Sequence, residues 1–286
     1  MLKKLRRQSP PSREERWQNP ALARLASLPP TPGRAYRFIF VVGASGSGTT
    51  LLTRILSAPA GTVCLGGKYW TVPEADREAW QLMKLFNWII TILWDRRASL
   101  DDWQRARQAL PTVLDAFLRQ PAYAGHSHVI YKRSAPFNPG DQFRPDLHDL
   151  FALLPDVGVV AIYRDPCAST YSSWRRDFMP DLHQMAVVCE EQLTYLSAQL
   201  ASLPPADRFV LPYEAFCRQP DAWLPGLADF CRLPSDALQA AVVQAQVTPA
   251  GHDKWQQELD PAGQQFLTQF FSERRRQQWP LLRSNA

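Results

Sequence analysis

Apolar and polar positions along the chain form two alternating patterns, short continuous apolar runs and longer stretches with helical periodicity. Continuous apolar runs predict strands buried on both faces, because such strands have no solvent-facing side for polar residues. These runs lie at 36–42, 62–65, 128–132, 158–163 and 208–212. Strands that alternate with helices predict an α/β fold with a central parallel sheet of about four to five strands.

Helical periodicity fills the stretches between the runs. It predicts helices at 49–57, within 74–120, and at 145–153, 167–177 and 181–202, with mostly short helices from there to the end. The helix at 181–202 has one apolar face, typical of packing against a core, made of Leu182, Met185, Cys189, Leu193, Leu196 and Leu200.

The segment Trp80–Trp94 is unusually apolar, with three tryptophans and a single charge. It is too short to span a bilayer as a helix. We interpret it as a helix buried against the sheet. The alternative is that it forms the wall of an apolar pocket for a substrate.

A glycine-rich turn joins the first apolar run to the first predicted helix. The run ends at Val42, the turn Gly43–Gly48 follows, and the helical pattern begins at Thr49. Glycines let backbone N–H groups converge and the helix end adds partial positive charge, so this arrangement forms an anion site. The hydroxyls of Ser47, Thr49 and Thr50 are further donors. The turn therefore predicts a bound phosphate group, with a purely structural turn as the alternative.

The turn differs from the loop of nucleoside triphosphatases at one decisive position. That loop has a glycine, four residues, a second glycine, a lysine, and a serine or threonine. Gly43, Gly48 and Thr50 match, but Thr49 replaces the lysine that neutralises phosphates during transfer. The sequence therefore argues against an ATPase or a kinase, although the predicted architecture is a P-loop-type three-layer sandwich.

A second candidate phosphate site follows the run 158–163. Arg164 comes directly after this predicted strand, at the carboxyl edge where open α/β sheets bind ligands. Pro166 suits the first turn of a following helix, and Ser172 lies about two helical turns beyond Arg164, so its side chain can return toward it. An arginine and a serine beside a phosphate loop are typical of a phosphate site. The alternative is that Arg164 and Asp165 form a surface pair that caps the helix.

Together the two segments resemble the sulfotransferase superfamily, whose enzymes use 3′-phosphoadenosine-5′-phosphosulfate (PAPS). In that family a loop ending in Ser-Gly-Thr-Thr grips the 5′-phosphosulfate, and residues 47–50 match it. A second motif, an arginine, Asp or Asn, a proline, and a serine eight residues after the arginine, grips the 3′-phosphate, as Arg164 and Ser172 would. The resemblance runs from about 36 to 280 and implies binding of PAPS and its product, adenosine 3′,5′-bisphosphate (PAP), without a metal ion.

Three further segments resemble the family in the same order along the chain. Tyr131-Lys132-Arg133-Ser134 resembles a strand that ends in an active-site lysine, so Lys132 is the candidate cation at the leaving phosphate. Tyr213-Glu214-Ala215-Phe216 resembles a segment whose tyrosine lies near the adenine, and Lys254–Leu259 a C-terminal Lys-Trp segment of bacterial members. The implied donor-binding residues are Ser45, Gly46, Ser47, Gly48, Thr49, Thr50, Arg164, Ser172 and Tyr213.

Three positions depart from the family's catalytic pattern. The family's basic residue before Ser-Gly-Thr-Thr falls on Gly46, the glutamate of its protein-tyrosine branch on Gly67, and the histidine of its small-molecule branch on Ser134. Lys68, beside Gly67, is therefore a second candidate catalytic residue that could replace the charge missing at Gly46. The alternative is a solvated loop lysine.

The catalytic base stays open. His126 and His128 precede the strand that carries Lys132, and His128 lies about 13 Å from Lys132 along an extended chain, toward the wrong end of the strand. Glu74, Asp76 and Glu78 could serve as a base or stand in the first turn of a helix, where carboxylates are favoured. An acceptor that is already nucleophilic at neutral pH would need no strong base.

Charge and composition indicate a basic tail on a soluble body. Residues 1–16 hold six Lys/Arg and two Glu, about +4 of the formal net charge of +5. The basic excess therefore belongs to the tail and does not indicate nucleic-acid binding by the fold. With six prolines, residues 1–33 are expected to be mostly irregular, and 34–286 to form one sulfotransferase-like domain. The tail could touch acidic lipid, but a solvated end is the simpler expectation.

The remaining sequence features favour a cytoplasmic enzyme. There is no secretory apolar region or spanning run, the five cysteines form no CxxC pair, and no His/Cys cluster suggests a metal site. The expected function is sulfuryl transfer from PAPS to a hydroxyl or amine of a small molecule, lipid, glycan or peptide. The alternatives are a degenerate member that binds PAP without transfer, and a P-loop kinase or NTPase. The oligomeric state and the acceptor stay open.

Overall fold

A sheet of five parallel strands forms the centre of the protein. The computed structural model describes residues 36–66, 72–73, 75–93, 99–134, 147, 151, 153–154, 156–248, 254–272 and 277–280. The sheet order is β2-β3-β1-β4-β5, and every neighbouring pair is parallel. The strands are β1 (Arg37–Gly43), β2 (Thr62–Cys64), β3 (His128–Ser134), β4 (Val157–Tyr163) and β5 (Arg208–Pro212). The prediction that the apolar runs pair in one parallel sheet is confirmed.

Helices connect the strands and cover both faces of the sheet. They are α3 (Thr49–Leu56), α4 (Arg77–Leu93), α5 (Leu100–Leu118), α7 (Pro166–Trp174), α8 (Leu182–Ser202), α9 (Tyr213–Arg218), α10 (Pro220–Cys231), α11 (Ser235–Gln244), α12 (Lys254–Glu258) and α13 (Pro261–Phe270). Two short 3-10 helices, η1 (Pro121–Tyr123) and η2 (Pro205–Asp207), precede β3 and β5. Most of the helix expected at 145–153 lies outside the described residues, as does the boundary expected at residue 33.

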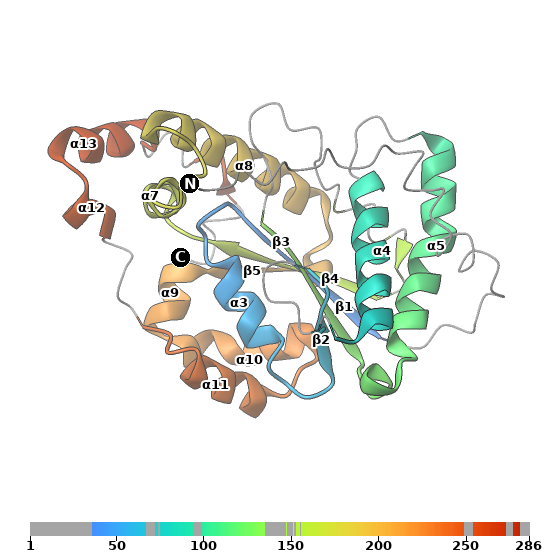
Figure 1. Cartoon of the computed structure of the whole chain (residues 1–286). Helices are drawn as coiled ribbons and strands as arrows, with labels where there is room; N and C mark the ends of the chain where they lie inside the picture. The colour runs from blue at the N-terminus through green and yellow to red at the C-terminus, as the bar shows by residue number, and fades with distance from the viewer. Residues whose placement is uncertain are drawn as a thin grey trace, which may run out of the picture.

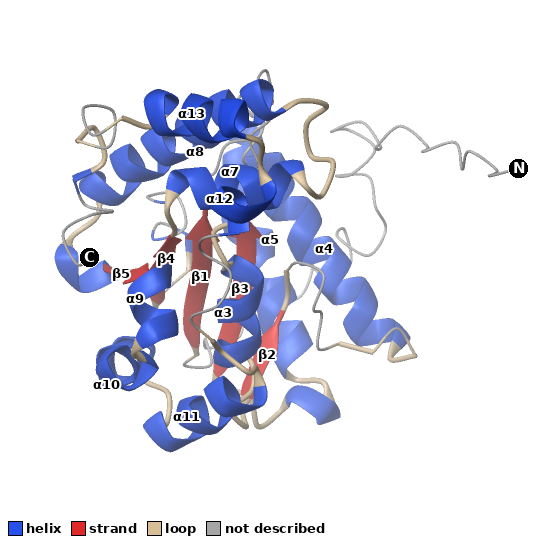
Figure 2. Ribbon diagram, turned by 90° about the vertical axis from the view of Figure 1, so that its left-hand side faces the viewer, coloured by secondary structure: helices blue, strands red, loops and turns tan. Residues whose placement is uncertain are grey.

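The central strand shows how the three layers arise. Along β1 every residue is buried, and successive side chains point to opposite faces. Phe38, Phe40 and Val42 pack in a core with α4, α5 and α8, whereas Ile39 and Val41 pack in a second core with α3, α10 and α11. Figure 1 shows these two groups of helices on opposite sides of the sheet, and Figure 2 shows α3 in front of the strands with α4 and α5 behind them.

The apolar segment beginning at Trp80 forms most of α4 and packs against the sheet. Phe86 lies with its ring centroid 5.9 Å from that of Phe38 and 5.5 Å from that of Tyr131. Met83, Ile89 and Ile90 are fully buried. The interpretation as a buried helix therefore accounts for the described side chains. In the described part of the chain, no helix combines the length and hydropathy that crossing a bilayer requires.

One predicted helix ends earlier than the sequence suggested. The pattern predicted 167–177, but α7 ends at Trp174. Asp177 adopts a left-handed backbone conformation, with φ of 56°, which cannot continue a right-handed helix. The following chain turns back into α8, whose N-cap Asp181 accepts a hydrogen bond from the Gln184 N–H.

Candidate functional site

The turn between β1 and α3 presents the N-terminus of α3 without a side-chain cap. Gly48 is the N-cap residue and has φ of 99° and ψ of 9°, a left-handed conformation that favours glycine. Within the turn, the Ser47 N–H donates to the Ala44 carbonyl at 3.1 Å. First-turn N–H groups have no acceptor inside their helix, and where no side chain caps them an anion can accept from them. The turn is therefore built as the sequence predicted for an anion site.

The three hydroxyl residues of the segment 47–50, at the end of the turn and the start of α3, differ in burial and contacts. Ser47 and Thr49 are 1% and 4% exposed, and the Ser47 hydroxyl has no hydrogen-bond partner among the residues that the structure describes. Thr50 is half-buried, and its hydroxyl oxygen accepts from the Lys132 ammonium at 2.8 Å. Thr49, which occupies the place of the triphosphatase lysine, is thus a buried residue, and the available cation comes from β3.

Lys132 reaches the turn because β3 lies directly beside β1. Lys132 pairs with Val41 in the sheet register, two residues before the turn begins. Its side chain crosses to α3 at the carboxyl edge of the sheet, where it bonds Thr50. The structure therefore brings the predicted lysine to the predicted phosphate loop.

Arg164 contacts the turn from the other side, at the end of β4. Its Nη1 donates to the Gly46 carbonyl at 3.0 Å, and its guanidinium carbon lies 4.7 Å from the ring centre of Tyr213. Tyr213 also touches Gly48, since a Cβ at that glycine would come 2.7 Å from Tyr213 Cδ2. Burial raises the pKa of Tyr213 to about 12, so its phenol stays neutral at physiological pH. Arg164, Tyr213 and both glycines therefore form one cluster.

Half-buried polar groups hold the turn that presents Arg164. Asp165 caps α7 by accepting from the Ala168 N–H at 3.0 Å, and its own N–H donates to Glu214 Oε1 at 2.9 Å. Burial raises the pKa of Glu214, and the hydrogen bond from Asp165 partly opposes that shift. The alternative that Arg164 and Asp165 form a surface pair capping the helix is therefore correct only for Asp165. Asp165 caps α7, whereas Arg164 contacts the loop.

Ser172 is the predicted residue that the structure does not join to the cluster by a hydrogen bond. It is half-buried on α7, and its backbone carbonyl accepts from Arg176 Nε at 2.8 Å. Its hydroxyl forms no hydrogen bond with any residue that the structure describes. A role at the 3′-phosphate therefore stays a prediction for Ser172.

Gly46 lies where no other residue fits without strain. Its φ is +81°, and a Cβ there would come 2.4 Å from the Ser169 carbonyl oxygen and 2.7 Å from Ser173 Oγ. Both serines belong to α7, which lies against the turn at this point. The basic residue that the family carries here is therefore excluded by the close approach of a helix. Sequence reasoning missed Ser169 and Ser173, although two small residues four apart on one helix face signal close packing.

Some of the residues predicted to act as a cation or a base lie away from the turn. Lys68 and Glu74 fall outside the described residues. Asp76 accepts from the Ala79 N–H at 3.3 Å at the start of α4, and Glu78 accepts from Gln120 at 3.1 Å on the surface. These two carboxylates are therefore occupied in the packing of α4.

The two histidines lie at the opposite edge of the sheet from Lys132. His128 pairs with Arg37, the first residue of β1, whereas Lys132 pairs with Val41 near the carboxyl end of that strand. Burial lowers the pKa of His128, and its Nδ1 lies 3.0 Å from the Ser127 hydroxyl. The expectation that His126 and His128 point away from the site agrees with this register. Among the described residues, no group of three His, Cys, Asp or Glu side chains is placed to hold a metal ion.

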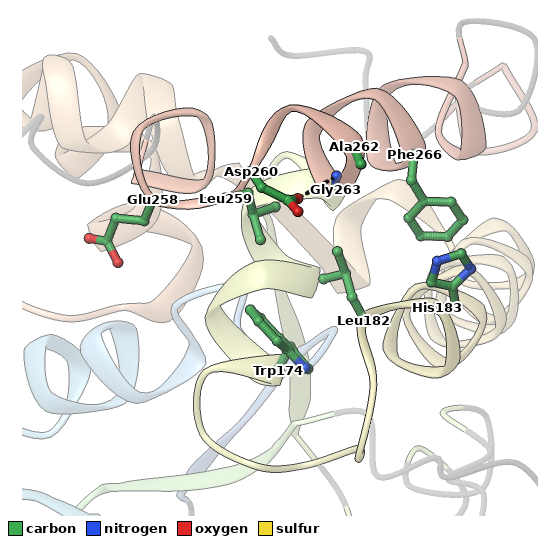
Figure 3. Close-up of a pocket in the computed structure, with 9 residues that line it drawn as sticks. All are labelled: Trp174, Leu182, His183, Glu258, Leu259, Asp260, Ala262, Gly263 and Phe266. Carbon is green, nitrogen blue, oxygen red and sulfur yellow. Dashed lines mark hydrogen bonds between the residues drawn. The ribbon is translucent and has the colours of Figure 1, made fainter.

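A hollow of about 430 Å³ lies on another part of the molecule, between the end of α7, the start of α8 and the α12–α13 pair. The His183 ring stacks on Phe266 there, with centroids 3.8 Å apart (Figure 3). None of the predicted site residues lines it; the lining is Trp174, Leu182, His183, Glu258, Leu259, Asp260, Ala262, Gly263 and Phe266. The hollow is thus separate from the candidate donor site.

A model of the sulfotransferase family matches residues 39–237, which include the turn, Lys132, Arg164 and Tyr213. The chain belongs to the sulfotransferase family. No curated protein matches it. The predicted family is confirmed by a match over more than half of the chain.

Solved structures of sulfotransferases share the fold at low sequence identity. The sulfotransferase domain of the Synechococcus PCC 7002 olefin synthase is 17% identical, with a TM-score of 0.50, over 85% of this chain and 98% of that domain. The sulfotransferase domain of the curacin biosynthetic pathway is 15% identical, with a TM-score of 0.51, over 82% and 97%. A sulfotransferase from Alicyclobacillus acidocaldarius is 15% identical, with a TM-score of 0.50, over 87% and 96%. The likeness supports the predicted P-loop-type sandwich.

Proposed function

We propose that this family member transfers a sulfuryl group from PAPS to a hydroxyl or amine acceptor and releases PAP. The observation that carries the proposal is the meeting of three features at one sheet edge. The uncapped N-terminus of α3, the Lys132 ammonium and the Arg164 guanidinium all contact the turn Gly43–Gly48 or the residue Thr50 that follows it. This arrangement suits a ligand with two separated anionic groups.

Different residues are proposed to bind different parts of PAPS. The N–H groups at the start of α3, which no side chain caps, and the Thr50 hydroxyl are proposed to bind the 5′-phosphate end. Arg164, with Ser172, is proposed to hold the 3′-phosphate, and Tyr213 to lie near the adenine. PAPS, when bound, supplies the activated sulfuryl group.

Lys132 is proposed to stabilise negative charge at the leaving phosphate. A fixed ammonium aimed at the place where charge develops lowers the barrier, because its interaction strengthens in the transition state. Its hydrogen bond to Thr50 at 2.8 Å holds the side chain at the loop in the absence of ligand. The second candidate cation, Lys68, stays a prediction.

The acceptor is proposed to be a small molecule, lipid, glycan or peptide. Asp76 and Glu78 are engaged elsewhere, and the histidines lie at the other sheet edge. Of the candidate bases that the structure describes, none is therefore at the loop. An acceptor that is nucleophilic at neutral pH, such as an unprotonated amine, fits this site best.

The two alternatives are separated from this proposal by different evidence. A kinase or NTPase needs a lysine at position 49, where this chain has a threonine that is 4% exposed. A PAP-binding protein without transfer activity would also use a lysine held at the loop, as Lys132 is, so turnover is what distinguishes it from a transferase. We also propose a cytoplasmic location, because all five cysteines are buried and none of them forms a disulfide among the described residues.

Two measurements test the proposed function. Titration calorimetry should show PAP binding at least about tenfold more tightly than ADP, because ADP lacks the 3′-phosphate that Arg164 would bind. Turnover with ³⁵S-labelled PAPS and a panel of amines and alcohols should then show transfer that Lys132→Ala lowers. Equal affinity for ADP would remove the PAPS assignment, and tight PAP binding without transfer to any acceptor would favour the binding protein.

A further inference from the structure

The face of α8 that packs into the protein is mostly apolar and carries a single buried amide. Gln192 is 1% exposed and lies between Cys189 and Leu196, both of which are buried. A buried amide is costly unless it is hydrogen-bonded. Gln192 therefore needs a partner, and the structure shows where it finds one.

The partner is the phosphate loop, 147 positions earlier in the chain. Gln192 Oε1 accepts from the Ser45 backbone N–H at 2.8 Å, and Gln192 Nε2 donates to Ser45 Oγ at 3.2 Å. A backbone N–H can only donate, so the amide oxygen must face it and the amide nitrogen must face the hydroxyl. The two bonds thus fix both the backbone and the side chain of Ser45.

Ser45 precedes Gly46, the loop residue that contacts α7 and Arg164. Gly46 rests against Ser169 and Ser173 of α7, and its carbonyl accepts from Arg164 at 3.0 Å. A shift of Ser45 would move that carbonyl and with it the guanidinium. The loop is therefore held at Ser45 by α8 and at Gly46 by α7, which leaves the residues from Gly48 onward to face a ligand.

We propose that Gln192 is a positioning residue for donor binding, an inference that rests on the proposed function. It holds the first half of the loop so that the N-terminus of α3 and the Arg164 guanidinium face the same doubly anionic ligand. Gln192 does not touch the ligand. Its effect on binding passes through Ser45.

The test compares Gln192→Met with a matched control on the same helix. Methionine nearly preserves the volume and removes both hydrogen bonds. The control is Gln199→Met, because Gln199 Oε1 also accepts from a distant backbone N–H, that of Leu147 at 2.9 Å, but does not touch the loop. If the Gln192 amide were merely structural, both substitutions would lower the melting temperature and neither would change the affinity for PAP.

Two readouts make the result specific. Without nucleotide, amide exchange at Ser45, followed by NMR, should be about tenfold faster in Gln192→Met, the change that loss of about one such hydrogen bond gives. The dissociation constant for PAP should rise about tenfold or more in Gln192→Met and less than about twofold in Gln199→Met. If Gln192→Met does not fold, Gln192→Asn, whose amide is one methylene too short for Ser45, repeats both measurements.

The outcomes separate this inference from the proposed function. A parent protein that binds PAP, with Gln192→Met or Gln192→Asn binding it equally well, overturns the positioning role alone. Unchanged exchange at Ser45 overturns it as well. A parent protein that does not bind PAP overturns both the proposed function and this inference.

Discussion

Replacing Gly46 by alanine should destabilise the protein more than any ordinary glycine substitution. The new Cβ would come 2.4 Å from the Ser169 carbonyl oxygen, and the backbone is at φ +81°. A left-handed conformation costs a non-glycine residue roughly 1–2 kcal/mol, and forcing an extra carbon into a packed site costs about 1–3 kcal/mol. We therefore expect the free energy of unfolding to fall by about 2–5 kcal/mol, a large part of a typical total of about 5–15 kcal/mol.

Two other glycines separate the backbone cost from the steric cost. Gly61 has φ of +78°, but the nearest atom to its Cβ would be 3.7 Å away, so Gly61→Ala should cost only about 1–2 kcal/mol. A Cβ at Gly125 would meet nothing within 4 Å, so Gly125→Ala should be neutral or slightly stabilising. Urea unfolding of the three variants, with the slope of each transition checked against the parent, gives the comparison.

The outcome that would refute this reasoning is a Gly46→Ala protein as stable as Gly61→Ala. It would mean that α7 moves away from the loop at no cost. Removing the Ser173 hydroxyl should not restore stability to Gly46→Ala, because the closer atom belongs to the backbone of Ser169. The same clash predicts that a lysine introduced at position 46 cannot restore the family's missing cation.

Three further predictions concern the charged groups around the loop. Arg164→Ala should weaken PAP binding, measured by calorimetry, about tenfold or more, since the substitution removes a charge-assisted donor. The control Arg105→Ala, which removes an exposed partner of Asp101, should leave the affinity for PAP unchanged. Lys132→Ala should lower kcat more than it weakens PAP binding. The control Lys84→Ala on α4 should change neither quantity. Equal losses of kcat and PAP binding in Lys132→Ala would make Lys132 a binding residue only. Because burial raises the pKa of Glu214 above its ordinary value of 4.5, its contribution to stability is present below that pH and is lost as pH rises. Glu214→Gln should flatten this loss in urea unfolding followed from pH 4.5 upward, and an unchanged pH profile would contradict it.

The sheet could be predicted from the sequence because each strand contains an apolar run. β1 and β4 are buried at every residue, so the runs mark them without reference to any partner. The positions of Lys132 and Arg164 could be predicted from the same runs, because the runs show where the strands end. Each stands at the carboxyl end of a parallel strand, and parallel strands bring those ends to one edge.

The contacts that support the loop could not be predicted because they join segments far apart in the sequence. Gln192 was counted neither as core nor as site, yet it is the polar position in the apolar stripe that includes Cys189 and Leu196. A polar residue in such a stripe predicts a buried partner but does not identify it. Ser45, its partner, could be identified only once α8 was placed beside β1.

The absence of a basic residue at position 46 has a structural cause, and it constrains where positive charge can come from. Since α7 leaves no room for a side chain at Gly46, the cation proposed for the leaving phosphate has to come from another element. Lys132 of β3 is already at the loop. The exit of β2 lies beside it, because a Cβ at Gly66 would come 2.8 Å from the Lys132 carbonyl oxygen. Lys68 follows Gly66 by two residues and lies outside the described residues, so its role as a second cation stays a prediction.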